Sequence, residues 1–126
     1  MRRAFTLIET LIAIAVFSLG VLILFDGFTL SLRYSRASRD TAVATHAAEQ
    51  AVEQIRLSGF TALAINTNPS PIAVSGLDQG QQKTFVDLYS GNANIKQVTV
   101  EIYYRTRPES QAISLTTLVS QNGIHG

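Results

Sequence analysis

The chain begins with a run of apolar residues that is long enough to cross a membrane. Residues 5–25 hold fourteen Leu, Ile, Val or Phe residues and a single charge, Glu9. As an α-helix this run is about 31 Å long at 1.5 Å per residue, which matches the roughly 30 Å hydrocarbon core of a bilayer. The apolar side chains favour insertion by at most about 4 to 8 kcal/mol, against roughly 2.5 to 3.5 kcal/mol for a carboxylate at the helix centre. Because Glu9 lies near one end, residues 5–25 are expected to form a transmembrane helix.

Beyond Phe28 the pattern becomes amphipathic with helical spacing. Apolar or small side chains recur every three or four residues along one face, at Leu30, Tyr34, Ala37, Thr41, Ala44, Ala48, Ala51 and Ile55. No Pro interrupts residues 5–58, and Ser58-Gly59 is a typical end signal. We therefore expect one helix of about 80 Å, whose half at 26–58 packs its Ala-rich face against a sheet of larger side chains.

The rest of the chain predicts a loop followed by a small antiparallel sheet. Residues 59–82 combine Pro, Gly and polar residues with short apolar pieces, which is typical of a functional or mobile loop. Residues 83–126 then alternate in polarity, which predicts half-buried strands at 84–89, 95–105 and 112–119 and turns at 90–94 and 107–110. The inward side chains are expected to be Val98, Val100, Ile102 and Tyr104 on the second strand and Ile113, Leu115, Thr117 and Val119 on the third.

These elements together predict the α+β fold class. A long N-terminal helix, membrane-spanning in its first half, packs on an antiparallel sheet of about three strands.

The composition narrows the classes of function. The 126 residues include ten Lys or Arg, nine Asp or Glu and no Cys, which excludes disulfides, Cys-based zinc sites and thiol catalysis. The near-neutral charge and the lack of a basic groove argue against nucleic-acid binding. No phosphate loop, nucleophile motif or pair of acids in a cleft is present, so we expect neither an enzyme nor a cofactor. His46, Glu49, Gln50 and Glu53 share a helical face, but a lone His-x-x-Glu is more typical of a solvated face than of a metal site.

Glu9 is the chemically unusual position. An acid inside a membrane helix is functional by default, because a low dielectric penalises an unpaired carboxylate and strengthens its pairing with a cation. A water-exposed position at headgroup depth is the alternative. No small-x-small site follows the apolar run, so an ordinary signal peptidase finds no bond to cut and the helix is retained.

The arginines of the chain give two opposing indications of how the helix is oriented in the membrane. Arg2 and Arg3 precede the span and place the N terminus in the cytoplasm by the positive-inside rule. Three further arginines beyond the span favour the opposite orientation, namely Arg33, Arg36 and Arg39.

The N-terminal segment resembles the prepilin cleavage and methylation signature of type IV pilins and type II secretion pseudopilins. Arg2-Arg3-Ala4, then Phe5-Thr6-Leu7-Ile8-Glu9, then the apolar run carry this likeness. The resemblance implies that residues 1–4 are a leader peptide, which a prepilin peptidase removes by cutting between Ala4 and Phe5 on the cytoplasmic face. The same peptidase would methylate the new amine of Phe5, and Glu9 would pair with the N terminus of a neighbouring subunit. The implied precursor is an inner-membrane protein with an extracytoplasmic C-terminal domain, and it joins a filament with other pilins or pseudopilins.

Three features depart from a major pilin. Ala4 stands where Gly usually precedes the cut, Asp26 stands where many major pilins carry Pro, and the C-terminal cysteine pair is missing. These departures favour a minor pilin or pseudopilin, and the stretches 98–104 and 113–119 most resemble PilV-type minor pilins and type II secretion pseudopilin I. The sequence leaves both a pilus and a secretion system open.

The alternative from another class of protein is a bitopic membrane protein. It would have an uncleaved signal anchor and an extracytoplasmic ligand-binding domain, and it would keep residues 1–4.

Overall fold

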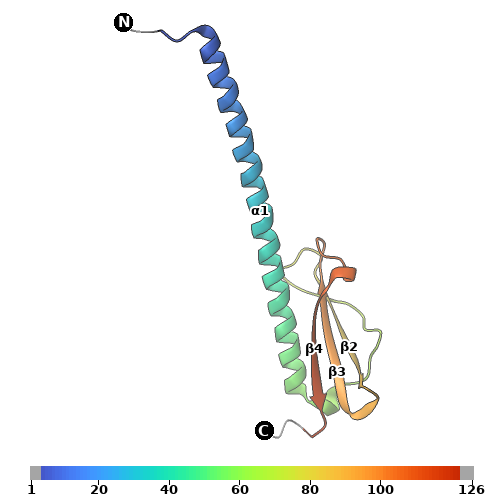
Figure 1. Cartoon of the computed structure of the whole chain (residues 1–126). Helices are drawn as coiled ribbons and strands as arrows, with labels where there is room; N and C mark the ends of the chain where they lie inside the picture. Colours follow the sequence, from blue (N-terminus) through green and yellow to red (C-terminus); the bar gives the residue numbers. More distant parts are fainter. Residues whose placement is uncertain (1–3, 123–126) are drawn as a thin grey trace. The chain divides into compact units, whose positions relative to one another are not determined.

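A computed structural model describes residues 4–122, which fall into two compact units, one ending at Ser38 and the other beginning at Arg39. A single helix, α1 (Leu7–Ser58), contributes to both (Figure 1). After it come η1 (Phe60–Ala62), β1 (Ile72–Ala73), β2 (Gln81–Tyr89), β3 (Asn92–Tyr103), η2 (Glu109–Gln111) and β4 (Ile113–Ser120). The predicted α+β class is confirmed. Arg2 and Arg3 of the predicted leader lie outside the described residues.

α1 begins at Leu7, two residues later than predicted, because Thr6 caps it. The Thr6 hydroxyl accepts a hydrogen bond from the backbone N–H of Glu9 at 3.3 Å. A capping residue keeps a non-helical backbone, so Phe5 and Thr6 stay outside the helix. At the other end α1 stops at Ser58 as predicted, since Gly59 takes a φ of 78°, in the left-handed region that glycine adopts readily.

The first unit is a helix with almost nothing covering it. Every side chain from Ala4 to Ser38 is exposed except that of Val21, which is half-buried. This helix is part of α1, the one helix of the described residues that is long and apolar enough to cross a membrane, with a mean hydropathy of 2.6 over its best 18-residue window. The predicted continuous helical face is buried only in its later part, because Leu30, Tyr34 and Ala37 are exposed.

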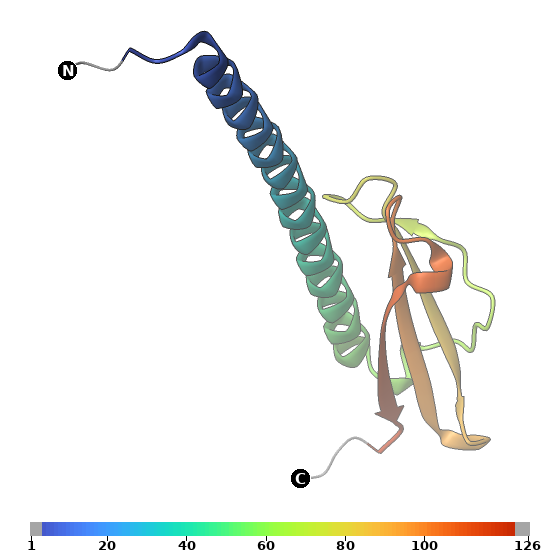
Figure 2. The ribbon, with the colours of Figure 1, turned by 45° about the horizontal axis from the view of Figure 1, so that its top comes forward.

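The second unit contains an antiparallel sheet with the strand order β1-β2-β3-β4 (Figure 2). Its fourth strand, β1, was not predicted, because two residues paired as Ile72 with Gln82 and Ala73 with Gln81 are too short to alternate in polarity. β3 begins at Asn92, three residues earlier than predicted. The reason is the tight Ser90-Gly91 turn with φ of 51° and 74°, since a two-residue turn of this kind lets pairing start at once.

The core of the second unit lies between α1 and the inner face of the sheet. Ala44 and Ala48 are fully buried, and Ala51 is nearly so, in one cluster with Val100 and Ile102. The small alanine side chains bring the helix backbone close to the larger strand residues, as the sequence predicts. The predicted inward faces are confirmed, because the inward side chains of β3 and that of Tyr104, one residue beyond it, are buried, and those of β4 are all buried or half-buried.

The loop before β2 covers the edge of that strand. Asn66 and Val86 exchange two backbone hydrogen bonds of 2.9 Å each, and the backbone N–H of Val74 donates to Gly80 at 2.9 Å. The ammonium group of Lys96 donates to the carbonyl oxygens of Phe60 and Leu63 and lies 4.1 Å from the centroid of the Phe60 ring. The loop therefore protects a sheet edge that would otherwise expose unpaired backbone groups.

Candidate functional site

The predicted cleavage site lies in an exposed, non-helical segment. Ala4, Phe5 and Thr6 precede α1 and have no regular secondary structure. Phe5 is 81% exposed. Exposed segments of irregular chain are the preferred sites of proteolytic cleavage, whereas a helix would have to unfold first. The local structure thus leaves the Ala4–Phe5 bond accessible.

Glu9 occupies the first turn of α1 with its carboxylate free. Its backbone N–H is taken by the Thr6 hydroxyl, and the carbonyl oxygen of Thr6 accepts from the backbone N–H of Thr10 at 3.2 Å. The carboxylate itself is exposed and makes no hydrogen bond or ion pair within residues 4–122. The backbone N–H groups of Glu9 and Thr10 are therefore satisfied without the Glu9 side chain.

Glu9 has no ion-pair partner among residues 4–122, and in apolar surroundings its carboxylate needs a cation. The positive end of the helix dipole favours an acid in the first turn by about 0.3 to 1 kcal/mol. That is small beside the several kcal/mol that an unpaired carboxylate costs in a low-dielectric environment. From Thr10 to Phe25 the sequence carries no charge that could compensate it.

The structure places the predicted residues Ala4, Phe5 and Glu9 in one short segment and adds Thr6 to them. The role of Thr6 as a helix cap was not predicted, although the pattern Thr-x-x-Glu at residues 6–9 is the sequence signal of a capping box. Only half of the box is present among residues 4–122, since the Glu9 N–H donates to the Thr6 hydroxyl but the Glu9 carboxylate accepts no bond from the Thr6 N–H. The carboxylate is therefore not occupied by the cap.

Two glycines of α1 have open space beside them within residues 4–122. A Cβ atom built on Gly20 or on Gly27 would meet nothing within 4 Å. With Ala13 they form a stripe of small residues spaced by seven positions. Small residues on a membrane helix let another helix approach closely.

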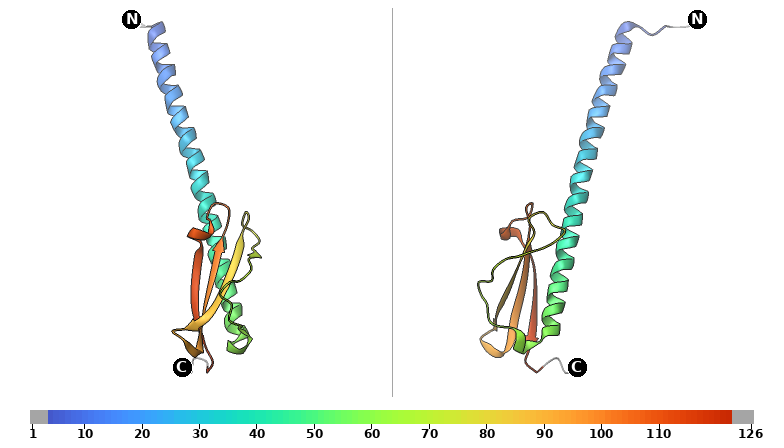
Figure 3. Two further views of the ribbon diagram at one scale, coloured as in Figure 1. Left: turned by 90° about the vertical axis from the view of Figure 1, so that its right-hand side faces the viewer. Right: turned by 180° about the vertical axis from the view of Figure 1, so that it is seen from behind.

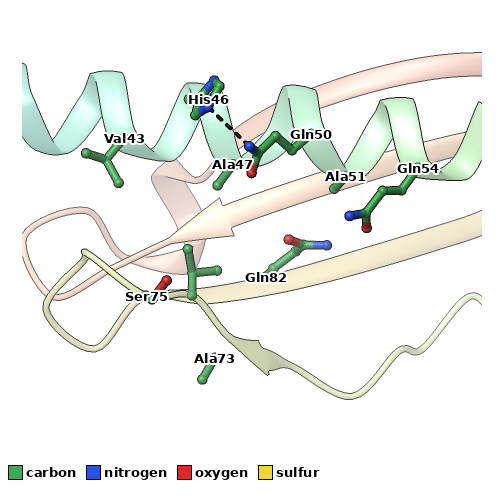
Figure 4. Close-up of a pocket in the computed structure, with 10 residues that line it drawn as sticks. Val43, His46, Ala47, Gln50, Ala51, Gln54, Ala73, Ser75 and Gln82 are labelled. Atoms are coloured by element: carbon green, nitrogen blue, oxygen red, sulfur yellow. Dashed lines mark hydrogen bonds between the residues drawn. The ribbon is translucent and has the colours of Figure 1, made fainter.

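A polar groove lies in the second unit between α1 and the segment around β1 (Figure 4). It has a volume of about 400 Å³ and is lined by three glutamine side chains, Gln50, Gln54 and Gln82. His46 lines it as well and is hydrogen bonded to Gln50 at 3.2 Å, as Figure 4 shows. A nucleophile needs a base within hydrogen-bond reach, and within the described chain no such bond joins Ser75 to His46. The groove offers neutral polar contacts.

The predicted helical face around His46 shows no metal-binding arrangement in the part of the chain that the structure describes. No group of three or more His, Cys, Asp or Glu side chains between residues 4 and 122 could hold an ion.

One ion pair on the outer face of the sheet perturbs a titratable group. Lys83 Nζ lies 2.5 Å from Glu109 Oε1, and the Lys83 side chain is 19% exposed. The hydrogen bond to Glu109 raises the pKa of Lys83 above its ordinary value of 10.5, with burial opposing it and the charge of Glu109 adding to it. The Tyr103 ring lies 5.7 Å from the same ammonium group. This pair links β2 to η2.

The comparisons with known proteins concern the N-terminal segment. Residues 1–25 match the family model of the prokaryotic N-terminal methylation motif. The search of curated proteins and the search of solved structures each find no match to the chain. The matched range contains the predicted leader, the Ala4–Phe5 bond, Glu9 and the apolar run. The match therefore supports a type IV pilin-like relationship through the first 25 of the 126 residues.

Proposed function

We propose that the chain is a minor pilin or pseudopilin, a structural subunit of a filament. Residues 1–4 are a leader that a prepilin peptidase removes, after which the new amine of Phe5 is methylated. The precursor is held in the inner membrane by residues 5–25 with its N terminus in the cytoplasm. The mature chain then enters, or primes, a type IV pilus or a type II secretion pseudopilus together with other pilins or pseudopilins.

The remaining segments have separate roles in this proposal. Residues 26–58 support the sheet region at 83–126, which faces the extracytoplasmic side, and the loop at 59–82 belongs to the same domain. The burial of Ala44 and Ala48 beneath Ile102 supports the role given to residues 26–58, because it packs the later part of the helix against the sheet.

The observation that carries the proposal is the free carboxylate of Glu9. It stands at the head of an uncovered apolar helix, without an ion-pair partner in residues 4–122. Cutting the Ala4–Phe5 bond creates an amine, which is a cation on an equally exposed segment of every other copy. Pairing Glu9 of one subunit with that amine of a neighbour satisfies both charges in a low-dielectric assembly.

The bitopic alternative draws its support from the polar groove of Figure 4, which gives the second unit a place for a neutral ligand. It gives Glu9 no ion-pair partner among residues 4–122, and it leaves the match at residues 1–25 without a role. For these reasons the filament subunit is the better-supported function.

Replacing Glu9 with Gln in cells that carry the cognate assembly system tests the proposal. We expect normal membrane levels and normal loss of the leader, because the substitution makes the helix more apolar and leaves the bond to be cut untouched. Incorporation into filaments should fall by about a hundredfold or more, since breaking a buried ion pair by removing one partner costs about 3 to 5 kcal/mol.

Asp26→Asn is the matched control for this experiment. It removes one carboxylate at the other end of the same apolar run and should leave incorporation unchanged. If Glu9→Gln enters filaments as efficiently as Asp26→Asn, the role proposed for Glu9 is wrong.

A further inference from the structure

The two edges of the sheet differ in how they are protected. On the β2 side, β1 and the loop residue Asn66 cover the strand. On the other side β4 is the last strand, and within residues 4–122 no further strand or bridge pairs with it (Figure 3). The sequence of β4, Ile-Ser-Leu-Thr-Thr-Leu-Val-Ser, contains no charge and no Pro. It therefore lacks the features that usually keep an exposed edge from pairing with another chain.

The hydrogen bonds beside β4 identify which of its backbone groups point outward. The backbone N–H of Gln121 donates to Asn94 at 2.9 Å, so these two residues form a hydrogen-bonded pair. In an antiparallel ladder such pairs alternate with pairs whose backbone groups point away from each other. With Ile95 opposite Ser120, the odd-numbered residues of β4 are bonded to β3 and the even-numbered ones face outward.

The hydrogen bonds at the β2 edge of the sheet independently give the same assignment of outward-facing groups on β4. Val86 is bonded to Asn66, so it turns its backbone groups away from its partner Val98. Val98 must then be hydrogen bonded to Thr117, which is an odd-numbered residue of β4. The outward-facing backbone N–H and C=O groups belong to Ser114, Thr116, Leu118 and Ser120.

A groove runs beside this edge, between β4 and the flank of α1. Its upper hollow, of about 340 Å³, is lined by Glu49, Val52, Glu53, Arg56, Leu115, Thr116 and Thr117. Its lower hollow, of about 560 Å³, is lined by Arg56, Gly59, Phe60, Thr61, Leu118, Val119, Ser120 and Gln121. Arg56 separates the two and donates to the Thr117 hydroxyl at 3.2 and 3.3 Å. A strand added to β4 would place alternate side chains in these hollows.

The upper hollow fits a basic side chain. Glu49 and Glu53 form no ion pair with any described residue, and Val52 and Leu115 supply an apolar wall beside them. A lysine or arginine can lay its aliphatic stem on such a wall and bring its charge to the carboxylates. Two carboxylates against the one guanidinium of Arg56 leave the hollow with a net negative charge.

The lower hollow fits an apolar side chain. The residues that line it include Phe60, Leu118 and Val119, and none of them is an acid. Residues 115–117 line the upper hollow and residues 118–121 line the lower one, so the centres of the hollows lie between three and four residues apart along the chain. Of these two spacings, only four keeps both occupants on the same face of an added strand.

We propose that the open edge of β4 binds an extended segment of a partner protein as an added strand. The segment carries a Lys or Arg for the upper hollow and, about four residues away, an apolar or aromatic side chain for the lower one. A second copy of β4 does not fit this description, because β4 has no basic residue and the pairing would bring two Glu49 and Glu53 pairs toward one interface. The proposal is independent of the role of Glu9.

A synthetic peptide tests the edge on the full chain in detergent micelles. The probe is the acetylated and amidated peptide Thr-Lys-Thr-Val-Thr-Phe-Thr, which has the required spacing. We expect saturable binding, followed by amide NMR signals of the chain. The amides of Ser114, Thr116 and Leu118 should shift and become protected from exchange, while those of Leu115 and Thr117, already bonded to β3, should change little.

Three controls make the result specific. A peptide N-methylated at alternate residues on its β4-facing side keeps every side chain and should bind at least about tenfold more weakly. A peptide with Glu in place of Lys should lose a similar factor, and so should the Thr116→Pro chain, which loses an outward N–H and keeps the ladder to β3. Far-ultraviolet circular dichroism checks that Thr116→Pro remains folded.

Several results would overturn the proposal. It fails if the first peptide does not bind, if N-methylation makes no difference, or if the shifted amides lie outside β4. It also fails if the purified chain alone protects Ser114, Thr116 and Leu118 in proportion to its own concentration, because a second copy would then be the occupant.

Discussion

At the residue scale, the start of α1 separates the backbone cap from the acid beside it. In a complete capping box the Thr6 hydroxyl accepts from the Glu9 N–H, and the Glu9 carboxylate accepts from the Thr6 N–H. Only the first of these two bonds is formed among residues 4–122, so the Glu9 carboxylate takes no part in capping. It is therefore available for the proposed assembly contact.

Thr6→Ala should loosen this helix start. Losing an N-cap hydroxyl costs about 0.5 to 2 kcal/mol, so the first turn of α1 should open more often. The measurement is hydrogen exchange at the Glu9 amide in the full chain in micelles, and we expect an acceleration of about fivefold for 1 kcal/mol. Thr6→Ser keeps the oxygen and should exchange like the wild type. Equal rates for the Ala and Ser variants would show that the cap is not formed.

The Lys83–Glu109 pair predicts a dependence of stability on pH. The pKa of Lys83 is raised in the folded chain, chiefly by its hydrogen bond to Glu109. The pair should therefore contribute its full stability below the unfolded pKa near 10.5 and lose it as the pH rises through the raised value. Thermal unfolding of the wild type and of Glu109→Gln should differ by a constant amount at neutral to mildly alkaline pH and converge at strongly alkaline pH. Parallel curves throughout that range would contradict the assignment.

Among single residues, the sequence predicts positions that belong to a linear motif but not positions that depend on how strands pair. A linear motif predicts Ala4, Phe5 and Glu9, and the roles assigned to them stay predictions. Thr6 lies in the same motif, but its role as a helix cap was not predicted. The outward amides of β4 could not be predicted, because they depend on the register between strands, which only the folded sheet provides.

At the scale of the elements, the interface between α1 and the sheet is built from alanine on one side and branched residues on the other. Ala44 and Ala48 leave room for Val100 and Ile102, all of them fully buried. The alternation of the strands predicted their inward faces, and the helical spacing predicted the buried alanines. The exposure of Leu30 and Tyr34 was not predictable from that spacing, because periodicity shows which face is apolar and not how far a sheet extends along it.

Ala48→Leu should destabilise the second unit. Ala48 is 0% exposed, so three added carbon atoms must displace the strand residues that cover it. Overpacking of this kind costs about 1 to 3 kcal/mol. The midpoint temperature of thermal unfolding should fall by roughly 4 to 8 °C for each kcal/mol lost in a domain of this size. The control is Ala42→Leu, at an exposed position of the same helix, which should unfold close to the wild-type temperature. A similar shift for both variants would contradict the described interface.

At the scale of the whole molecule, the two units call for different surroundings. The first is an uncovered apolar helix with 0% of its best spanning window buried, which is unfavourable in water. The second has its own core of buried residues from α1 and the strands. A subunit that waits in a membrane and then joins the helical core of a filament gives the first unit apolar surroundings in both states. In the proposed function, this change of surroundings is why a free acid near the N terminus is useful.

The proposed function is tested most directly by the mass of the intact chain. The chain is purified from the membranes of cells that contain a prepilin peptidase. A processed filament subunit has lost residues 1–4 and carries one added methyl group on the amine of Phe5. The same chain from cells without the peptidase should keep Met1 to Ala4 and carry no such methyl group. If the chain from peptidase-containing cells retains residues 1–4, Phe5 provides no amine for Glu9 of a neighbour, and the chain is an uncleaved anchor instead.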